Sequence, residues 1–342
     1  MLLEEYLKKR SKDIEEILKT ILDTKYERIG LTTHRNADPD AIASIYLLRI
    51  FLEQYKKETY IILPEGMNSL SKNVLSILNI PFEYYRVEDL VNIEDIPLFI
   101  VVDTSNSIQL GNLYKHISGK EYIVIDHHTK GDLVDNAYRY FLDKLVSCSE
   151  IMYLLLRGKL KAHSIVYSLL LTGILYDSRK FTYVDNIIFD IVSELINLHN
   201  ADYLVALNSL KKEMDISEKI ARIKGAQRTR ILRANKYLVL FTNVSSFESS
   251  VARALLDLGA DLVFVVSINN ETRVVSRSTQ RFYRETGISL GRDLIPKITK
   301  YLGGTGGGHD TAAVYIGQCS LEDVFNVVLS VLKEYFGGVK IV

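Results

Sequence analysis

The sequence predicts an α/β protein: an N-terminal parallel-sheet domain with helices on both faces, followed by a smaller C-terminal α/β domain with a mixed sheet. Two observations favour this fold class. Short apolar runs rich in β-branched residues alternate with amphipathic segments over the first two hundred residues, and a similar alternation begins near residue 236. Strand, helix, strand repetition is typical of a parallel sheet. A length of 342 residues is sufficient for two domains.

The N-terminal domain is expected to span residues 1–205. Its first 23 residues, MLLEEYLKKRSKDIEEILKTILD, place leucine and isoleucine at helical spacing, which predicts a helix. The segments ERIGLTTH, YIIL, PLFIVVD and EYIVID predict four strands. Between the first two strands, residues 41–55 repeat an apolar side chain every three or four positions, which predicts a second helix.

Residues 206–235 are expected to form a helical linker, because the charged stretch KKEMDISEKIARIKGAQRTRILRANK separates the two patterns. Residues 236–342 form the second domain. Its pattern predicts the strand YLVLFTNV, the helix FESSVARALLDLG and the strands ADLVFVVSIN and ETRVVSRST. The glycine-rich stretch GGTGGGHD follows, and we expect a helix to begin in DTAAVYIG, directly after His309.

Composition excludes several classes of protein. The 42 basic and 42 acidic residues give a formal net charge of zero, so any anion-binding surface must be local. Two cysteines, Cys148 and Cys319, are too few for a disulfide framework or a cysteine-rich zinc module. No apolar run approaches the roughly 20 residues of a membrane span. We expect a cytoplasmic protein with no membrane partner, and the lack of tryptophan among abundant isoleucine, lysine, glutamate and tyrosine indicates a thermophilic or archaeal source.

The segment LTTHRNADPDAIAS concentrates three side chains that can bind metal. His34, Asp38 and Asp40 lie within seven residues, with Pro39 between the aspartates. Proline disfavours helical backbone at Asp38, which predicts a strand-to-helix loop that keeps both aspartates out of the helix. Two carboxylates and an imidazole at the end of a parallel strand repel one another unless a cation lies among them. An N-cap aspartate with two solvated neighbours is the alternative.

Further acidic residues follow the ends of apolar segments. Asp103 closes LFIVVD, Asp126 leads the triplet Asp126-His127-His128 after YIVI, and Asp177 follows LLLTGILY. An ionised carboxylate in such a place is costly unless it is paired or bound to metal. A set with many carboxylates, a few imidazoles and no thiolate suits Mn²⁺ or Mg²⁺ better than structural zinc. Its size suits two ions, a pair that can clamp a phosphoryl group, so hydrolysis of a phosphoester or phosphoanhydride is the leading reaction class.

These motifs carry a family resemblance. HRNADPD, the aspartate of VVDTS, the DHH of VIDHHTKGD and TGILYDSRKF resemble, in this order, the four motifs of the DHH phosphoesterase superfamily. GGTGGGHDTAA resembles the signature of the DHH-associated carboxy-terminal domain. The resemblance extends from about Arg28 to Ala313 and is greater to the nano-RNase and pAp-phosphatase group than to the longer RecJ-type exonucleases. Ala43 and the pair Ser178-Arg179 depart from the family pattern, but none of them is a predicted ligand.

The resemblance implies two divalent metal ions, with Mn²⁺ favoured over Mg²⁺ and Co²⁺. Six residues would be their ligands: His34, Asp38, Asp40, Asp103, His127 and Asp177. The first ion would take His34 and Asp38. The second ion would take Asp40 and His127, Asp103 would bridge the two ions, and Asp177 would complete the site.

The resemblance also assigns catalytic roles to Asp103, Asp126 and His128. His128 would face the substrate phosphate or polarise the nucleophile, and Asp126 would orient the histidines beside it without contacting metal. In the C-terminal domain, the family's serine, arginine and histidine grip the phosphate and sugar at the far end of the substrate. The corresponding substrate-binding residues would be Ser276, Arg277, Gly306, Gly307, Gly308 and His309. A solvated glycine loop is the alternative for this segment.

The sequence therefore predicts a hydrolase, an Mn²⁺-dependent phosphodiesterase of the oligoribonuclease (nano-RNase-like) type. It would convert short RNA or DNA oligonucleotides and linear dinucleotides such as pApA to 5′-mononucleotides by a two-metal mechanism. A pAp 3′-phosphatase, a single-strand-specific exonuclease and a pyrophosphatase are enzymatic alternatives. A non-catalytic replication scaffold is an alternative of another class, and the intact ligand set argues against it. A homodimer is left open.

Overall fold

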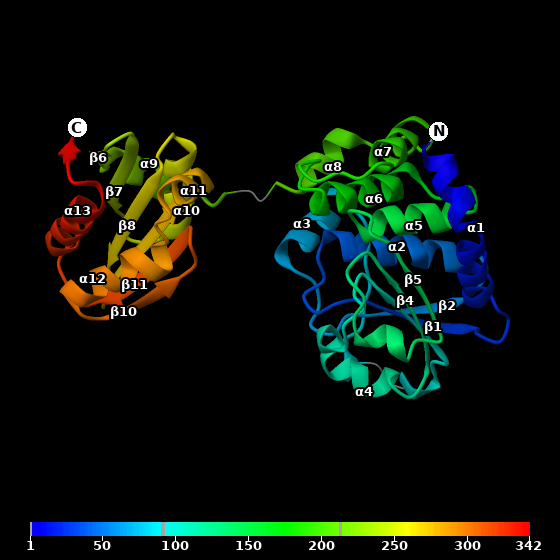
Figure 1. Ribbon diagram of the computed structural model, residues 1–342. Helices are drawn as coiled ribbons and strands as arrows, with labels where there is room; N and C mark the ends of the chain where they lie inside the picture. Colours follow the sequence, from blue (N-terminus) through cyan, green and yellow to red (C-terminus); the bar gives the residue numbers. More distant parts are fainter. Residues whose placement is uncertain (1, 90–92, 212–213) are drawn as a thin grey trace. The chain divides into compact units, whose positions relative to one another are not determined.

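The computed structural model describes residues 2–89, 93–211 and 214–342. The chain divides into two compact units, unit 1 (Met1–Lys212) and unit 2 (Glu213–Val342), each built around its own sheet (Figure 1). The predicted fold class is confirmed, because unit 1 holds a five-stranded parallel sheet and unit 2 a seven-stranded mixed sheet. In the parts of the chain that the structure describes, no helix combines the length and apolarity needed to cross a membrane.

The sheet of unit 1 has the strand order β2-β1-β3-β4-β5, with every neighbouring pair parallel. The strands are β1 (Arg28–Thr32), β2 (Glu58–Ile62), β3 (Leu98–Val102), β4 (Glu121–Asp126) and β5 (Arg139–Leu142). The chain leaves β1 for the neighbour on one side and returns as β3 on the other. The strand order therefore reverses between β1 and β3, and ligands of open α/β sheets bind at the carboxyl ends of strands at such a reversal.

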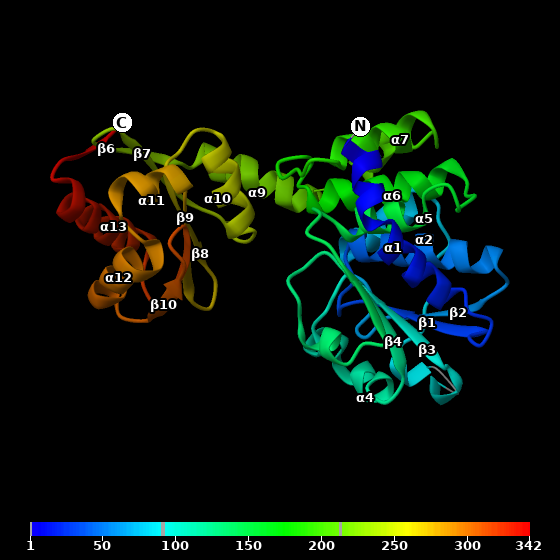
Figure 2. The ribbon, with the colours of Figure 1, turned by 45° about the vertical axis from the view of Figure 1, so that its right-hand side comes forward.

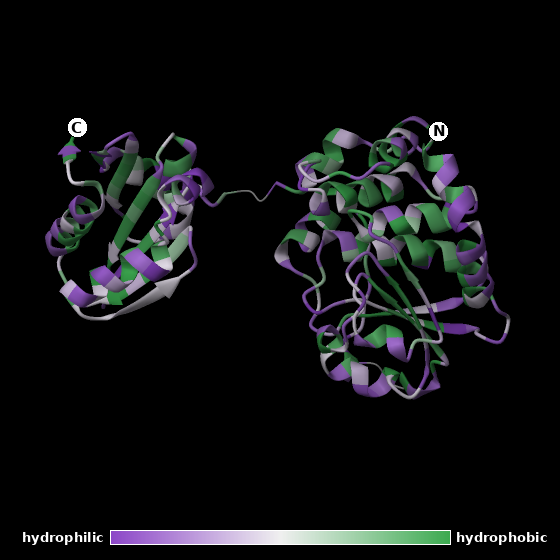
Figure 3. Ribbon diagram, viewed as in Figure 1, coloured by the Kyte–Doolittle hydropathy of each residue, from purple (hydrophilic) through white to green (hydrophobic). Residues whose placement is uncertain are grey.

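The longer helices of unit 1 pack together against one face of this sheet (Figures 1 and 2). They are α1 (Leu2–Ile21), α2 (Pro39–Gln54), α3 (Ser69–Ile77), α5 (Cys148–Leu156), α6 (Ser164–Asp177), α7 (Ile188–Asn197) and α8 (Tyr203–Ser209). The other face carries α4 (Tyr114–Ile117) and the 3₁₀ turns Ser107–Leu113 and Asp132–Asp135; two more turns, Val87–Asp89 and Ile93–Asp95, precede β3. Strand β3 is apolar on both sides, and Figure 3 shows hydrophobic residues concentrated in the sheet and in the helices beside it.

Helix α2 begins at the segment that was expected to be a loop. Asp38 is extended and is the N-cap, and its Oδ1 accepts hydrogen bonds of 3.1 Å from the backbone N–H groups of Asp40 and Ala41. The expectation that Asp40 lies outside the helix is wrong, because Asp40 belongs to the first turn. Proline at the first helical position has a preset φ and needs no hydrogen bond there, so Pro39 starts the helix and does not delay it.

The sheet of unit 2 has the strand order β10-β11-β9-β8-β7-β6-β12, and β7 and β8 are its parallel pair. The strands are β6 (Arg230–Ala234), β7 (Tyr237–Asn243), β8 (Leu262–Ile268), β9 (Thr272–Ser278), β10 (Thr305–Gly308), β11 (Ala312–Gly317) and β12 (Val339–Ile341). Helices α9 (Ile216–Gln227) and α10 (Glu248–Asp257) cover one face. The other face carries α11 (Gln280–Thr286), a π-helical turn (Leu290–Leu294), α12 (Ile295–Leu302) and α13 (Leu321–Phe336).

The helix predicted directly after His309 is wrong. Residues Ala312–Gly317 form strand β11, which pairs antiparallel with β9 and β10. The side chains explain this outcome: Ala313 and Tyr315 are buried in the core under α11 to α13, whereas Val314 packs on the opposite face. An apolar pattern with period two favours a strand over a helix.

The range expected to be a helical linker, residues 206–235, contains several elements. The end of α8 packs against α6 of unit 1, whereas α9 packs on α10 and β7, and β6 is a strand of the second sheet. Residues 212 and 213 lie outside the part of the chain that the structure describes.

The carboxyl groups of Glu150 and Asp185 lie close together at the start of α5 in unit 1 and hold its backbone by hydrogen bonds. Glu150 forms a capping box with Ser147, and both residues are fully buried. Asp185 lies nearby, and its oxygens accept hydrogen bonds from the backbone N–H groups of Val146, Ile187 and Ile188. Burial first, and then the charge of Asp185, raises the pKa of Glu150 to about 8.

This pair predicts a pH-dependent stability. The unfolded chain releases the proton of Glu150 near pH 4.3, while the folded protein keeps it to about pH 8, so the folded state binds more protons in between. Its contribution to stability is therefore complete below about pH 4 and is lost as the pH rises towards 8. Glu150→Gln keeps a hydrogen-bonding side chain but does not titrate. Relative to the wild type, its free energy of unfolding should rise by about 2 kcal/mol or more between pH 5 and pH 9.

Urea unfolding at pH 5, 7 and 9 measures this difference. The exposed Glu83→Gln variant is the control and should follow the wild-type curve at each pH. If the free energy of unfolding changes with pH in the same way in the wild type and in Glu150→Gln, the buried carboxyl has the same pKa in the folded and the unfolded protein, and the prediction is wrong.

Candidate metal centre

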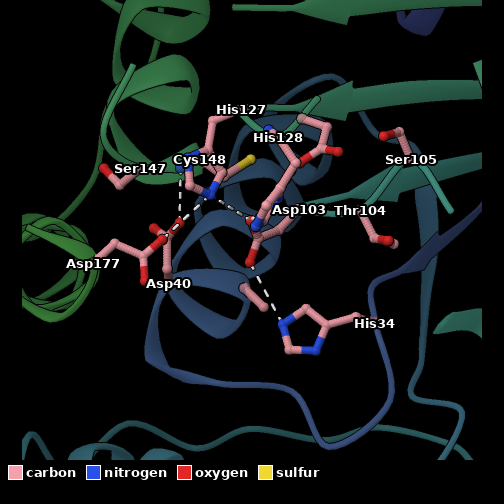
Figure 4. Close-up of polar contacts among 12 residues, drawn as sticks. His34, Asp40, Asp103, Thr104, Ser105, His127, His128, Ser147, Cys148 and Asp177 are labelled. Atoms are coloured by element: carbon pink, nitrogen blue, oxygen red, sulfur yellow. Dashed lines mark hydrogen bonds and ion pairs between the residues drawn. The ribbon is translucent and has the colours of Figure 1, made fainter. Parts of the chain in front are cut away.

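The predicted metal ligands of unit 1 come from the carboxyl ends of three neighbouring strands and from two helix ends. His34 follows β1, Asp103 directly follows β3, and His127 directly follows β4. Asp38 and Asp40 lie at the start of α2, and Asp177 is the last residue of α6. Segments far apart in the sequence thus meet around one site, as Figure 4 shows.

The six residues form two groups of potential ligands. One group is His34, Asp38 and Asp103, and the other is Asp40, His127 and Asp177. Within each group, one ligand atom of every residue lies within 4.8 Å of the others. The structure therefore brings all six predicted ligands together and adds Asp177 to the group of Asp40 and His127, while their binding of metal stays a prediction.

Asp103 connects the two groups. Its Oδ2 lies 3.5 Å from His34 Nε2, and its Oδ1 lies 3.3 Å from His127 Nε2, so its two oxygens face different histidines (Figure 4). Its backbone is left-handed, with a φ of 61°, which is uncommon for any residue but glycine and costs of order 1 kcal/mol. The backbone N–H of Asp103 donates to Ile125 O at 2.9 Å and holds this turn against β4.

Buried polar atoms at the site indicate that its donor set fits a cation. Asp40 and Asp103 are almost completely buried, and within the described ranges Asp103 Oδ1 and His127 Nε2 make an ion-pair contact with each other but no hydrogen bond. His127 Nε2 lies 3.3 Å from an oxygen of Asp177 as well. Nitrogen and carboxylate oxygen atoms in this arrangement suit a divalent ion such as Mn²⁺.

The ionisation of the site reflects the same crowding. Burial favours the neutral forms, but pairing with Asp103 and Asp38 raises the pKa of His34 to about 11, and pairing with Asp103 and Asp177 raises the pKa of His127 to about 12. Burial likewise opposes ionisation of Asp103, yet His127 and His34 lower its pKa to about 2. The two imidazolium groups thus offset only part of the carboxylate charge: burial, and then the charges of neighbouring aspartates, raise the pKa of Asp40, and a divalent cation competes with the protons for the same lone pairs.

Helix α5 holds Asp40 in place. Asp40 is completely buried, and its Oδ2 and Oδ1 accept hydrogen bonds from the backbone N–H groups of Cys148 (2.7 Å) and Ser149 (2.9 Å). These N–H groups belong to the first turn of α5, where helices stabilise negative charge. Cys148 contributes its backbone and not its sulfur, because burial and then the nearby carboxylates raise the pKa of its buried thiol.

Asp126 and His128 lie beside the ligands and differ in exposure. Asp126 is completely buried, and its Oδ1 accepts hydrogen bonds from the backbone N–H of His128 (3.2 Å) and from its Nδ1 (2.8 Å). The His128 ring is more than half exposed and borders a cavity that His34 and Asp103 also line. The hydrogen bond with Asp126 raises the pKa of His128. Asp126 therefore fixes the ring through Nδ1 and leaves Nε2 without this constraint.

The cavity of about 440 Å³ extends beyond the predicted residues. Its further lining comes from the loops after β3 and β4: Thr104, Ser105, Asn106, Gln109, Thr129, Lys130 and Gly131. Ser105 ties these loops together, because its hydroxyl donates to Thr129 O and accepts from the backbone N–H of Gly131. Sequence reasoning missed this part of the site, although its position after two predicted strand ends is a usable signal. A larger cavity of about 690 Å³ lies against α1 and contains none of the predicted ligands.

The residues predicted in unit 2 lie on or next to β9 and β10, the two strands that flank β11. Ala313 pairs with Gly308 on one side and with Ser276 on the other, and Ala312 pairs with Arg277. Ser276 is completely buried and its hydroxyl donates to Ala313 O, so its side chain does not reach the surface.

Arg277 and His309 are more accessible than Ser276. Arg277 is half-buried, and within the described residues its Nε has no hydrogen-bond partner and its guanidinium no ion-pair partner. Burial, and then the charge of Arg253 on α10, lowers the pKa of Arg277. His309 is exposed after the β10 glycines, of which Gly306 to Gly308 are exposed as well. Arg253 is a residue that sequence reasoning missed, because only the packing of α10 on β9 brings it near Arg277.

Comparisons with known proteins agree with the fold and with the motifs. The profile described as "DHH family, N-terminal domain" matches residues 28–174. The uncharacterized protein MJ0988 of Methanocaldococcus jannaschii is 30% identical over 324 residues, which cover 91% of this chain and 95% of MJ0988. The cyclic-di-AMP phosphodiesterase PdeA of Listeria monocytogenes is 23% identical over 354 residues, covering 96% of this chain and 50% of PdeA. The chain therefore matches about half the length of that relative.

A solved structure shows the same fold. An exopolyphosphatase-related protein from Bacteroides fragilis has a TM-score of 0.58 and 15% sequence identity, covering 96% of this chain and 97% of the other. The extent of the match to MJ0988, together with the profile match over the segment that supplies five of the six predicted ligands, leads to one assignment. The chain belongs to the DHH family of phosphoesterases.

Proposed function

We propose that this protein is an Mn²⁺-dependent phosphodiesterase that hydrolyses short oligonucleotides and linear dinucleotides to 5′-mononucleotides. The observation that carries the proposal is the pair of ligand groups joined by Asp103, whose two oxygens face His34 and His127. Two adjacent divalent ions are an established arrangement for in-line displacement at phosphorus. Membership of a phosphoesterase family supports the same reaction class.

The substrate class is supported by a relative and by charge. PdeA is named as a phosphodiesterase of a cyclic dinucleotide, and about half of its length aligns with this chain. A dinucleotide offers a phosphodiester for the metal centre and a second phosphate for a cationic surface. In unit 2, Arg277 on β9 and the neighbouring Arg253 on α10 provide positive charge, and β11 separates β9 from the exposed glycines of β10. We therefore favour substrates that carry a free terminal phosphate in addition to the phosphodiester.

Each residue of the site has a definite task in this proposal. His34, Asp38, Asp40, Asp103, His127 and Asp177 would hold the two ions. When bound, these ions supply positive charge that stabilises the phosphoryl oxygens and favours water as the nucleophile. His128 is held through Nδ1 by Asp126, so its Nε2 can donate a hydrogen bond to a phosphoryl oxygen in the cavity. Arg277 and His309 would bind the neighbouring nucleotide.

Other reactions remain as competing proposals for the same residues. A pAp 3′-phosphatase and a single-strand-specific exonuclease would use the same metal ligands but break different bonds: the phosphatase removes a terminal phosphomonoester, and the exonuclease cleaves the phosphodiesters of longer strands. Cyclic dinucleotides are a further candidate, favoured by the name of PdeA. A scaffold without catalysis has no need for six ligands that converge on one site.

Substrate length distinguishes these readings. In a time course with 5′-labelled RNAs of two to twenty-four nucleotides and Mn²⁺, we expect dinucleotides to be cleaved at least about tenfold faster than the longest RNA. Parallel reactions with pApA, cyclic di-AMP, pAp and single-stranded DNA place the alternatives on the same scale. Equal rates at all lengths would contradict the preference for short substrates, and a folded protein without any turnover would favour the scaffold.

The Asp103→Ala variant tests the shared ligand. Because Asp103 faces both ligand groups, its loss should weaken the binding of both ions. Activity should fall at least about a hundredfold, which exceeds the 10- to 100-fold effects typical of residues that contact the ligands but not the metal. Calorimetric titration with Mn²⁺ measures the stoichiometry separately from turnover. Asp13→Asn, an exposed change on α1, is the control and should bind as the wild type does. Retention of two ions at wild-type affinity would refute the bridging role.

The His309→Ala variant tests the substrate surface of unit 2. His309 is exposed and belongs to no predicted ligand group, so its loss should raise KM for a dinucleotide severalfold and change kcat little. Arg273→Ala is a matched control, since Arg273 is an exposed cation on the same strand as Arg277. A KM that stays at the wild-type value in His309→Ala, or that rises equally in both variants, would count against a specific grip by His309.

A further inference from the structure

Gly173 occupies the interior of α6, where glycine is unfavourable. It is buried four residues before Asp177, and glycine in a helix interior is about 1 kcal/mol less favourable than alanine. A Cβ atom at this position would lie 2.1 Å from Ser149 Oγ, 2.9 Å from Asp40 Oδ1 and 3.1 Å from Ala43 Cβ. The missing side chain therefore allows α6 to approach the beginnings of α2 and α5 closely.

The two shortest of these contacts differ in how they can relax. The Ser149 hydroxyl can rotate, because within the described residues its one hydrogen bond is a long contact of 3.5 Å with Ser44 Oγ. The Asp40 carboxylate cannot move in this way, since both of its oxygens accept hydrogen bonds from the backbone of α5. The capping box of Ser147 and Glu150 in turn fixes that first turn. A methyl group at position 173 would thus press on a carboxylate that is held on its other side.

Gly173 also lies on the side of α6 that carries Asp177. Residues four apart in a helix share a face, and Asp177 belongs to the same ligand group as Asp40 and His127. The distance between α6 and the start of α2 therefore determines the distance between two carboxylates of one group. The three atoms nearest to a Cβ at position 173 include one from this group, Asp40 Oδ1, and none from the group of His34, Asp38 and Asp103.

We propose that Gly173 is a positioning residue for one of the two metal ions. Its lack of a side chain sets the spacing of Asp40 and Asp177 and so determines the affinity of the group that these residues form with His127. The inference rests on the proposed metal-dependent function and adds to it a residue that binds neither metal nor substrate. It also means that the two ion sites can be weakened separately.

The test is a Mn²⁺ titration of the full-length Gly173→Ala variant. We expect the wild type to bind two ions. The variant should bind one ion with nearly unchanged affinity and the other at least about tenfold more weakly, and the electron paramagnetic resonance signal of a coupled Mn²⁺ pair should be lost. Gly119→Ala is the control, because a Cβ there meets nothing within 4 Å. Thermal unfolding followed by circular dichroism reports whether each variant is folded.

Each outcome separates this inference from the proposed function. A folded wild type that binds no Mn²⁺ would contradict the proposed function itself. A wild type with two ions and a Gly173→Ala variant with two equally tight, coupled ions would overturn the role of Gly173 alone.

The double variant Gly173→Ala/Ser149→Ala removes the contact with the hydroxyl and keeps the contact with Asp40, so it should still bind the second ion at least about tenfold more weakly than the wild type. If the double variant binds the second ion with wild-type affinity, Gly173 serves only to make room for the Ser149 hydroxyl. The double variant also decides the matter if Gly173→Ala does not fold. Failure of both to fold, while Ser149→Ala folds, would equally contradict a positioning role.

Discussion

The dominant physical constraint in unit 1 is the concentration of negative charge at one edge of a buried sheet. Asp38, Asp40, Asp103 and Asp177 converge there, and two of these carboxylates are almost completely buried. Isolated charges in such a place are strongly destabilising. The surrounding structure compensates for them in three ways: paired imidazoles, backbone N–H groups at the start of α5, and bound cations in the proposed function.

This constraint connects features that look unrelated in the sequence. The left-handed turn at Asp103 directs its carboxylate between two histidines, and the capping box of Ser147 presents two N–H groups to Asp40. Gly173 lets α6, the helix that carries Asp177, come close to Asp40 and to the start of α5. The strained turn, the helix cap and the close helix packing therefore all stabilise the carboxylates of this one site. Such a concentration of strain and buried charge is typical of catalytic and binding sites.

The sequence was sufficient for the strands β1 to β4 of unit 1 and for the residues that converge on the edge of its sheet, but the edge strand β5 (Arg139–Leu142) was missed, because it is short and its first two residues are exposed. Buried parallel strands are nearly continuous apolar runs, and an aspartate that ends such a run is a strong local signal, as at Asp103. Partners that depend on tertiary packing had no such signal. The contact of Asp40 with α5 joins residues more than a hundred positions apart, and Arg253 becomes relevant only because α10 packs beside β9. The strand β11 was missed because a short apolar segment after glycines resembles a helix start until its alternating burial is seen.

The spread of the ligands along the chain has a consequence for folding. His34 to Asp40 are local, but Asp103, His127 and Asp177 reach them only after β1, β3 and β4 have paired and α6 has packed. A partly folded chain therefore offers a cation no more than a fragment of the site. Pairings between distant strands form late and slowly compared with local contacts. An ion that binds only the fully assembled site stabilises the native state over partly folded states. In the proposed function, metal binding would therefore also raise the free energy of unfolding of unit 1.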